Sequence, residues 1–320
     1  MTRGVSRNGS TPTDLSFRES LTILEILKDQ GTGEIDVMGG EPLLLPWMPD
    51  FAKKASEEGM KVNISTNGSC LTAIGRFRDI DPERITIGVS LEGSSERRHN
   101  TITASSHFSL AIEAIKTLLS FGLNLVVKTV VSRTTAPDIP NIVSLLRELG
   151  ARRYYLIHMD VLTRDPAIMK ESFPYPEFKL FYDDTALVNH DMEIFHVSAS
   201  CFTKEVIGQP ARCSGGVNKL SILPDGSVFP CNLFHRSPDF YLGNIMKENF
   251  LSIWANPRLE AFRESADNAC DDHLCVNRTS CTGGCPAHGH IHSGNFNGRD
   301  VRCELSPLTP SAHKRKASSH

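Results

Sequence analysis

Cysteine is the residue type whose number and spacing in this sequence point most directly to chemistry. Eight of the nine cysteines lie between Cys201 and Cys303. Four of these follow the spacing C-x4-C-x5-C-x3-C from Cys270 to Cys285. Short spacings allow neighbouring thiolates to reach one metal centre, and eight thiolates are enough for two cubane iron–sulfur clusters.

Disulfide bonds and structural zinc are the main alternatives for these cysteines. The chain opens Met-Thr-Arg-Gly without the apolar segment of an export signal, and a chain of 320 residues does not depend on disulfides to fold. Two zinc ions, each held by four thiolates, would use the same ligands, so composition leaves zinc open. Buried, inert thiols would not cluster in this way.

The first half of the chain alternates between strand-like and helix-like patterns. Strands are expected at 34–38, 61–65, 84–90, 123–131 and 153–159, with amphipathic helices between them. Such alternation predicts parallel βαβ units, closed as a barrel or left as an open doubly wound sheet. In both folds, ligands bind beyond the carboxyl ends of the strands.

Small, polar loops follow the first three of these strands. Their glycines would let a ligand approach the backbone, and their carboxylates and amide supply hydrogen-bonding groups. Together they predict a ligand pocket at one edge of the sheet. The loops read Gly39-Gly40-Glu41-Pro42, Ser65-Thr66-Asn67-Gly68 and Ser90-Leu91-Glu92-Gly93.

These loops resemble those of the radical S-adenosylmethionine (radical SAM) barrel, over about residues 14–150. By this resemblance, Gly39, Gly40, Glu41 and Pro42 form the GGEP motif that binds the amino group of S-adenosylmethionine. The later strand ends, through Ser65, Asn67, Ser90 and Glu92, would reach its methionine and ribose parts. The family often has an arginine in the stretch that corresponds to 101–104, and this sequence has none there.

The cysteine-rich half resembles the SPASM domain, in which two auxiliary [4Fe–4S] clusters are bound. The resemblance lies in Cys213-Ser214-Gly215-Gly216, the turn Leu223-Pro224-Asp225-Gly226, Ile253-Trp254 and Cys281-Thr282-Gly283-Gly284-Cys285. It implies that Cys201, Cys213, Cys231 and Cys285 hold the first cluster, and that Cys270, Cys275, Cys281 and Cys303 hold the second. Two details differ from the family: Cys270 and Cys275 are separated by four intervening residues where the family usually has two, and Cys201 lies unusually far before Cys213.

A radical SAM enzyme also needs a [4Fe–4S] cluster on a CxxxCxxC loop, and this sequence has no cysteine before Cys70. We therefore expect an α/β fold with an incomplete (β/α)6 partial barrel that lacks its first strand, followed by a small cysteine-rich α+β domain. The chain is expected to be N-terminally truncated and inactive as written, with the third cluster present in the full-length form. The alternative is a natural barrel that has lost radical chemistry.

Five segments are expected along the chain. An irregular N-terminus (1–14) precedes the partial barrel (15–165). A linker helix and strand (166–200) lead to the SPASM domain (201–305), and a disordered tail (306–320) follows.

Several other side chains are secondary candidates. His158 and Asp160, on or just after the last predicted barrel strand, could point into the barrel mouth, but a structural histidine is an equal alternative. His288, His290 and His292 could bind a metal, although a solvated loop is the favoured interpretation.

The resemblance implies an oxidoreductase or maturase that abstracts a hydrogen from a peptide or protein through a 5′-deoxyadenosyl radical. A tetrapyrrole precursor is the alternative substrate, and a non-catalytic iron–sulfur or zinc protein is the alternative function. The expected electron donor is a flavodoxin or ferredoxin. The net charge of −3 without a basic stripe argues against nucleic acid, and no apolar run reaches membrane-spanning length. A cytoplasmic protein is therefore expected.

Overall fold

The computed structural model describes residues 15–199, 202, 212–264 and 281–303. Its larger part is a six-stranded sheet in the order β1-β2-β3-β4-β5-β6, with every neighbouring pair parallel. The strands are β1 (Glu34–Val37), β2 (Lys61–Thr66), β3 (Ile85–Ser90), β4 (Asn124–Val131), β5 (Arg153–His158) and β6 (Glu193–Val197). This arrangement is the partial barrel that the sequence predicts.

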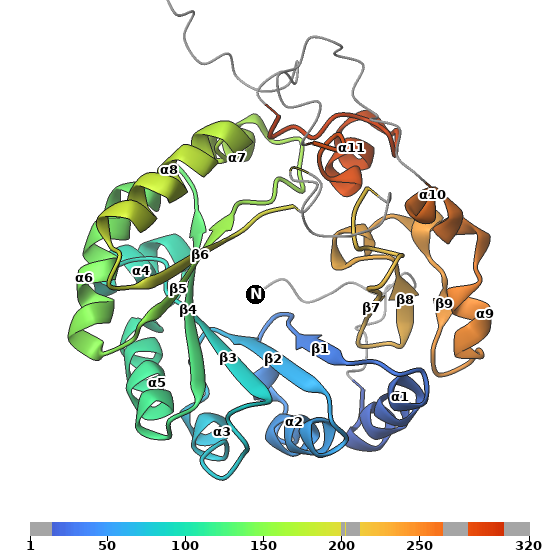
Figure 1. The fold of residues 1–320 in the computed structure, drawn as a ribbon, viewed down its shortest axis with the longest axis horizontal. Coiled ribbons are helices and arrows are strands. Elements are labelled where there is room, and N and C mark those ends of the chain that lie inside the picture. Colours follow the sequence, from blue (N-terminus) through green and yellow to red (C-terminus); the bar gives the residue numbers. More distant parts are fainter. Residues whose placement is uncertain (1–14, 200–201, 203–211, 265–280, 304–320) are drawn as a thin grey trace, which may run out of the picture.

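Helices cover the convex side of this sheet (Figure 1). They are α1 (Phe17–Asp29), α2 (Met48–Glu57), α3 (Leu71–Gly75), α4 (Glu96–Thr103), α5 (Phe108–Ser120), α6 (Ile139–Leu149), α7 (Pro166–Glu171) and α8 (Tyr175–Val188). The short turn η1 (Pro42–Leu44) follows β1, and the short turn η2 (Ala136–Asp138) precedes α6. The segment 166–200, expected to be a linker, therefore supplies α8 and β6, which pairs with β5 and belongs to the same sheet.

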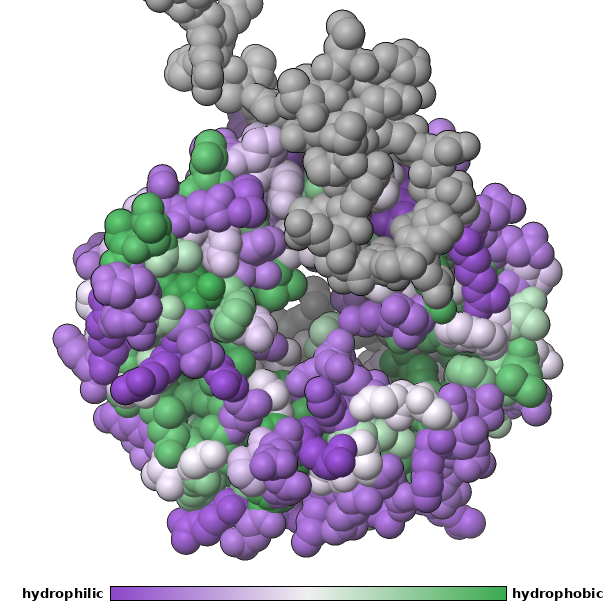
Figure 2. Space-filling view, viewed as in Figure 1, coloured by the Kyte–Doolittle hydropathy of each residue, from purple (hydrophilic) through white to green (hydrophobic). Residues whose placement is uncertain are grey.

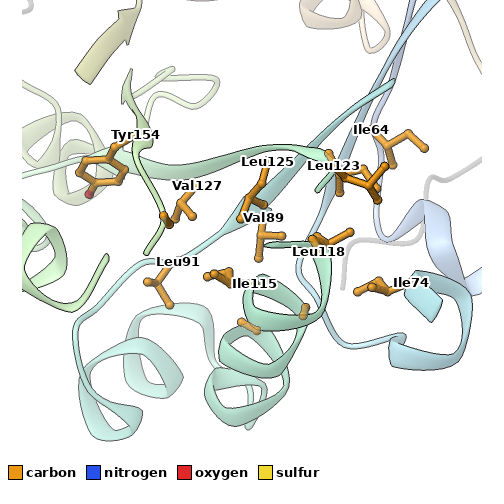
Figure 3. Packing of buried hydrophobic residues seen from close by; sticks show 14 of the residues in the cluster. Ile64, Ile74, Val89, Leu91, Ile115, Leu118, Leu123, Leu125, Val127 and Tyr154 are labelled. Carbon is orange, nitrogen blue, oxygen red and sulfur yellow. The ribbon is translucent and has the colours of Figure 1, made fainter. Parts of the chain in front are cut away.

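Strand alternation divides the sheet into an apolar face and a mixed concave face. Val89 and Val127 point toward α5, where they pack with Ile115 and Leu118 (Figure 3). All four side chains are fully buried. Because successive side chains of a strand point to opposite faces, the residues between them line the concave face.

The smaller part contains a three-stranded antiparallel sheet and short helices. Its strands are β7 (Ser221–Ile222), β8 (Ser227–Phe229) and β9 (Gly243–Asn244), and β7 and β8 form the hairpin that the Pro224-Asp225-Gly226 turn predicts. Its helices are α9 (Phe250–Trp254), α10 (Glu260–Arg263) and α11 (Pro286–Ser293), with the short turns η5 (Asn232–Phe234), η6 (Pro238–Phe240) and η7 (Pro257–Leu259). Its core is an aromatic group centred on Phe234 and Phe262, whose ring centroids are 5.4 Å apart.

Helix α1 joins the two parts. Its N-terminus has the predicted capping box, in which Ser16 Oγ accepts from the Glu19 N–H at 3.3 Å and Glu19 accepts from the Ser16 N–H at 2.8 Å. Leu24 packs into the core of the sheet, whereas Ile23 packs into the core of the small part. The small part lies beside β1 at one end and near α7 at the other, and the surface is hollowed near the centre (Figures 1 and 2).

Within the described residues, no helix is both long and apolar enough to cross a membrane.

Candidate functional site

The loops after β1 and β2 lie against each other, as their position at one edge of the sheet predicts. Glu41 joins them: its carboxylate accepts from Thr66 Oγ1 at 2.7 Å and from the Asn67 N–H at 2.7 Å. It also accepts from the Leu43 N–H at 3.1 Å, which caps η1. Glu41 therefore shapes this edge by bonding to the protein's own donors.

Gly39 and Gly40 leave open space at the same edge. A Cβ atom built on either glycine would meet no atom within 4 Å, and both residues are exposed. A ligand could therefore approach the backbone here without displacing a side chain. Pro42, the first residue of η1, is buried.

The loop after β3 is held by buried polar contacts. The Glu92 N–H donates to His99 Nδ1 at 3.1 Å, and the Glu92 carboxylate accepts from the Val130 N–H at 3.0 Å. Burial raises the pKa of Glu92 to about 7, although the Val130 N–H opposes this shift. Glu92 can therefore gain or lose a proton near neutral pH, a property common at functional sites.

Lys128 is a concave-face residue that sequence reasoning missed. From β4 it crosses β3 over Gly88, and its Nζ donates to Ser65 Oγ at 2.9 Å. A side chain at Gly88 would collide with the Lys128 side chain, so the missing Cβ makes room for the lysine. Burial lowers the pKa of Lys128, with Asp36 acting in the opposite direction. The signal in the sequence was a glycine inside a strand, which marks a close approach.

His158 is a structural residue of the core. Its ring stacks on Phe178 with centroids 4.4 Å apart, and its Nε2 lies 2.8 Å from the Phe173 carbonyl. Burial lowers its pKa to about 3, so the ring is neutral. Asp160 does not share its face: β5 ends at His158, and Asp160 turns toward the small part, where it contacts Arg302. His158 is therefore a structural histidine and not a residue of the barrel mouth.

Three of the predicted metal ligands come together in the small part. Gly215 lies between Cys213 and Cys231: a Cβ built on it would be 3.6 Å from Cys213 Sγ and 3.3 Å from Cys231 Cβ. Burial, together with the nearby Cys285 and Cys231, raises the pKa of Cys213 to about 12. Burial likewise raises the pKa of Cys231, with Cys285 adding to the shift.

This arrangement fits a bound metal centre. Clustered, buried thiols resist ionisation because burial disfavours the charged form and neighbouring thiolates repel one another, and a bound metal cation offsets both effects. No disulfide bond joins any two of the described cysteines, which are Cys70, Cys213, Cys231, Cys281, Cys285 and Cys303. Cys201, Cys270 and Cys275 lie outside the described residues.

The loop that carries Cys281 and Cys285 is fixed by Arg212. Its guanidinium donates to the Gly284 carbonyl at 2.9 Å and to the Gly283 carbonyl at 2.7 Å. The Gly283 N–H in turn donates to Cys281 Sγ at 3.3 Å. Arg212 is 2% exposed, so these charge-assisted bonds are shielded from water.

A solvated loop was expected for His288, His290 and His292, and this expectation is wrong. They lie on α11, where His288 and His292 are buried. Cys285, His288 and Asp300 present ligand atoms within 4.8 Å of one another. Burial and Arg302 lower the pKa of His288, but Asp300 and Asp160 together outweigh them and raise it to about 9. Both ring nitrogens of His288 already contact protein groups, with Nδ1 3.0 Å from Asp300 and Nε2 3.3 Å from Asp160, so the trio is part of a polar network within the protein.

Two family models match the chain over these two parts. The model of the radical SAM superfamily matches residues 2–146, and the model of the SPASM iron–sulfur cluster-binding domain matches residues 213–282. The partial parallel barrel followed by a cysteine-rich module is the architecture of radical SAM enzymes with a SPASM domain. The chain belongs to this family, and the expectations about family and fold class are confirmed.

Individual relatives extend over most of the chain. An AdoMet-dependent heme synthase of Oleidesulfovibrio alaskensis is 23% identical over 95% of this chain and 83% of its own length. A PqqA peptide cyclase of Streptomyces rochei is 26% identical over 93% of this chain and 85% of its own. The crystal structure of Streptococcus suis SuiB bound to its precursor peptide SuiA has a TM-score of 0.75 at 16% identity, and covers 94% of this chain and 72% of that one. The SuiB likeness concerns the fold.

Proposed function

We propose that this chain is the cofactor-binding and auxiliary-cluster part of a radical SAM/SPASM enzyme that modifies a peptide. The observation that carries the proposal is the convergence of Cys213, Cys231 and Cys285 in the small part. This group connects to the carboxyl edge of the sheet through Asp160, which follows β5 and bonds to the Cys285 loop through Arg302. The proposed cluster and the cofactor bound at the carboxyl edge of the sheet would thus both lie near one bound substrate.

The strand-end loops are the proposed S-adenosylmethionine site. Gly39 and Gly40 offer exposed backbone, while Pro42 and Glu41 fix the loop around them. The remaining proposed contacts come from the ends of β2 and β3, through Ser65, Asn67, Ser90 and Glu92. With one electron from the radical SAM cluster of the full-length form, the bound S-adenosylmethionine would lose methionine by cleavage of its C5′–S bond and supply the 5′-deoxyadenosyl radical that takes a hydrogen atom from the substrate.

The cysteines are the proposed ligands of two auxiliary [4Fe–4S] clusters. Cys201, Cys213, Cys231 and Cys285 would hold one, and Cys270, Cys275, Cys281 and Cys303 the other. The described ligand cysteines are buried or half-buried and are not joined to one another by disulfides, which supports this assignment, and two zinc ions would be the alternative occupants. A flavodoxin or ferredoxin is the proposed electron donor.

A peptide is the proposed substrate because relatives of similar coverage act on peptides by name, among them PqqA peptide cyclase. The likeness to AdoMet-dependent heme synthase supports a tetrapyrrole as the second candidate. The 320 residues contain no CxxxCxxC motif, so we propose that they do not cleave S-adenosylmethionine unaided. A non-catalytic iron–sulfur protein, the alternative function, would likewise not cleave S-adenosylmethionine.

Anaerobic reconstitution tests the cluster assignment. We expect about eight iron and eight sulfide per chain, with the broad visible absorption of cubane clusters. Alanine at Cys213, Cys231 or Cys285 should remove about half of the iron, whereas Cys70→Ala, the matched control outside the small part, should keep all of it. A colourless protein that retains two zinc ions would contradict the proposal.

Ligand binding to the reconstituted chain separates the substrate candidates. We expect equilibrium dialysis to detect S-adenosylmethionine binding that Glu41→Gln weakens, because the Thr66 and Asn67 contacts then lose a charged acceptor. Selection from a random peptide library should enrich specific sequences. Retention of a free tetrapyrrole without enrichment of any peptide would favour the second candidate.

A further inference from the structure

Four charged side chains form a closed network between the end of β5 and the cysteine loop. Arg302 donates through Nη1 to Asp160 Oδ1 at 2.8 Å, and through Nη2 and Nε to Asp300 at 2.9 and 3.1 Å. His288 spans the same two carboxylates, with Nδ1 3.0 Å from Asp300 and Nε2 3.3 Å from Asp160. Two basic side chains thus bridge two acidic ones.

The network is almost wholly removed from water. The side chains of His288 and Asp300 are 0% exposed and that of Arg302 is 1% exposed, whereas that of Asp160 is 40% exposed. Buried ion pairs of this kind seldom stabilise a fold more than well-packed apolar side chains of the same volume would. Their geometry therefore points to a role in placing or tuning a neighbouring group.

Asp300 contacts one cysteine from each of the two proposed ligand sets. Its Oδ2 accepts from the Cys285 N–H at 2.9 Å, and its carbonyl accepts from the Cys303 N–H at 3.0 Å. One residue thus holds the backbone of a ligand of the first cluster and of a ligand of the second. A shift of Asp300 would move both sulfur atoms.

Asp160 is the open end of the network. It follows β5 at the edge of the sheet where the cofactor and substrate are proposed to bind, and it alone of the four retains substantial exposure. It lies 140 residues before Asp300 in the sequence, and Arg302 and His288 bring the two carboxylates into one unit.

We propose that Asp300 is a positioning residue for the cluster ligands Cys285 and Cys303, and that Arg302 and His288 couple it to Asp160. The charge at Asp160 then helps to set the reduction potential of the cluster that Cys285 holds. This inference rests on the proposed function, because it takes Cys285 and Cys303 as cluster ligands. It adds a link between the edge of the sheet and the clusters.

Asp160→Asn in the reconstituted full chain tests the link. The measurements are iron content, thermal unfolding and the midpoint potentials from a redox titration followed by electron paramagnetic resonance. We expect full iron content and a more positive potential for one cluster, because a nearby negative charge is removed. Asp239→Asn, which removes an exposed carboxylate of the small part, is the matched control and should leave both potentials unchanged.

Asp300→Asn tests the positioning role, with loss of iron or altered spectra expected for both clusters. If this variant does not fold, Asp160→Asn and Arg302→Lys test the network instead. Lysine keeps the positive charge of Arg302 but cannot bridge two carboxylates as a planar guanidinium does. Potentials in Asp160→Asn equal to those of Asp239→Asn would overturn the inference. Full iron with unchanged potentials in Cys285→Ala would instead overturn the ligand assignment beneath it.

Discussion

Gly284 offers a sharp test of how the cysteine loop is built. Its φ of +74° lies in the left-handed region, and a Cβ on it would collide with the Cβ of Asp300. Gly294, at the end of α11, has nearly the same φ of +76° but open space around it. The pair therefore separates backbone strain from steric collision.

The expected cost of each alanine follows from these two terms. Left-handed backbone costs an alanine roughly 1–2 kcal/mol, and this is the whole penalty at Gly294. At Gly284 the collision adds roughly 1–3 kcal/mol, because Asp300 is buried and its bonds prevent it from moving away. We expect Gly284→Ala to lose about 2–5 kcal/mol of unfolding free energy and much of its iron.

Urea unfolding provides the assay. In a Trp47→Phe background, Trp254 of α9 is the remaining tryptophan, so its fluorescence reports on the small part. Iron content after reconstitution is measured on the same proteins. Equal losses of free energy for Gly284→Ala and Gly294→Ala, with full iron in both, would refute this account of the loop.

Three further predictions concern the sheet. Gly88→Ala should cost about 1–2 kcal/mol in the native chain but less in a Lys128→Ala background, and a double-mutant cycle with no coupling would contradict the packing of the lysine over the glycine. Because the folded pKa of Glu92, about 7, lies above its ordinary value of 4.5, its contribution to stability is complete below pH 4.5 and is lost as pH rises through 7. The unfolding free energy should therefore fall by about 2 kcal/mol more between pH 5 and 8 in the native chain than in Glu92→Gln, measured by urea titrations at each pH. Lys219→Ala breaks the 3.0 Å ion pair with Asp36 that joins the two parts, but both side chains are more than a third exposed, so calorimetry should show a loss below about 1 kcal/mol.

Much of the fold was predictable because its signals are local. The Ser16–Glu19 capping box, the helix that stops before Gly122 and the turn between β7 and β8 each depend on residues within a few positions of one another. Alternating strands and helices then predict a parallel sheet, and that rule placed the three glycine-containing loops at one edge. Cysteine spacing similarly indicated a metal-binding module.

Other features depend on which face a strand presents, and periodicity alone does not supply this. His158 belongs to the set of β5 residues that faces α8, so a candidate for the barrel mouth became a core residue. The parallel pairing of β6 with β5 likewise turned an expected linker into the sixth strand. The position of Lys128 on the concave face likewise depends on the pairing of β3 with β4, which places the Lys128 side chain over Gly88.

Local patterns in the residues were therefore enough to predict the order of the elements, the loops at the edge of the sheet and the candidate cysteine ligands. The contact of Asp160 with His288 and Arg302 could be seen only in the folded chain, because nothing in local spacing relates Asp160 to residues 128 or more positions away. Ion pairs between distant segments form when the packing of the two parts fixes their separation. Hydrophobic burial sets that packing, and the charges then fit within it.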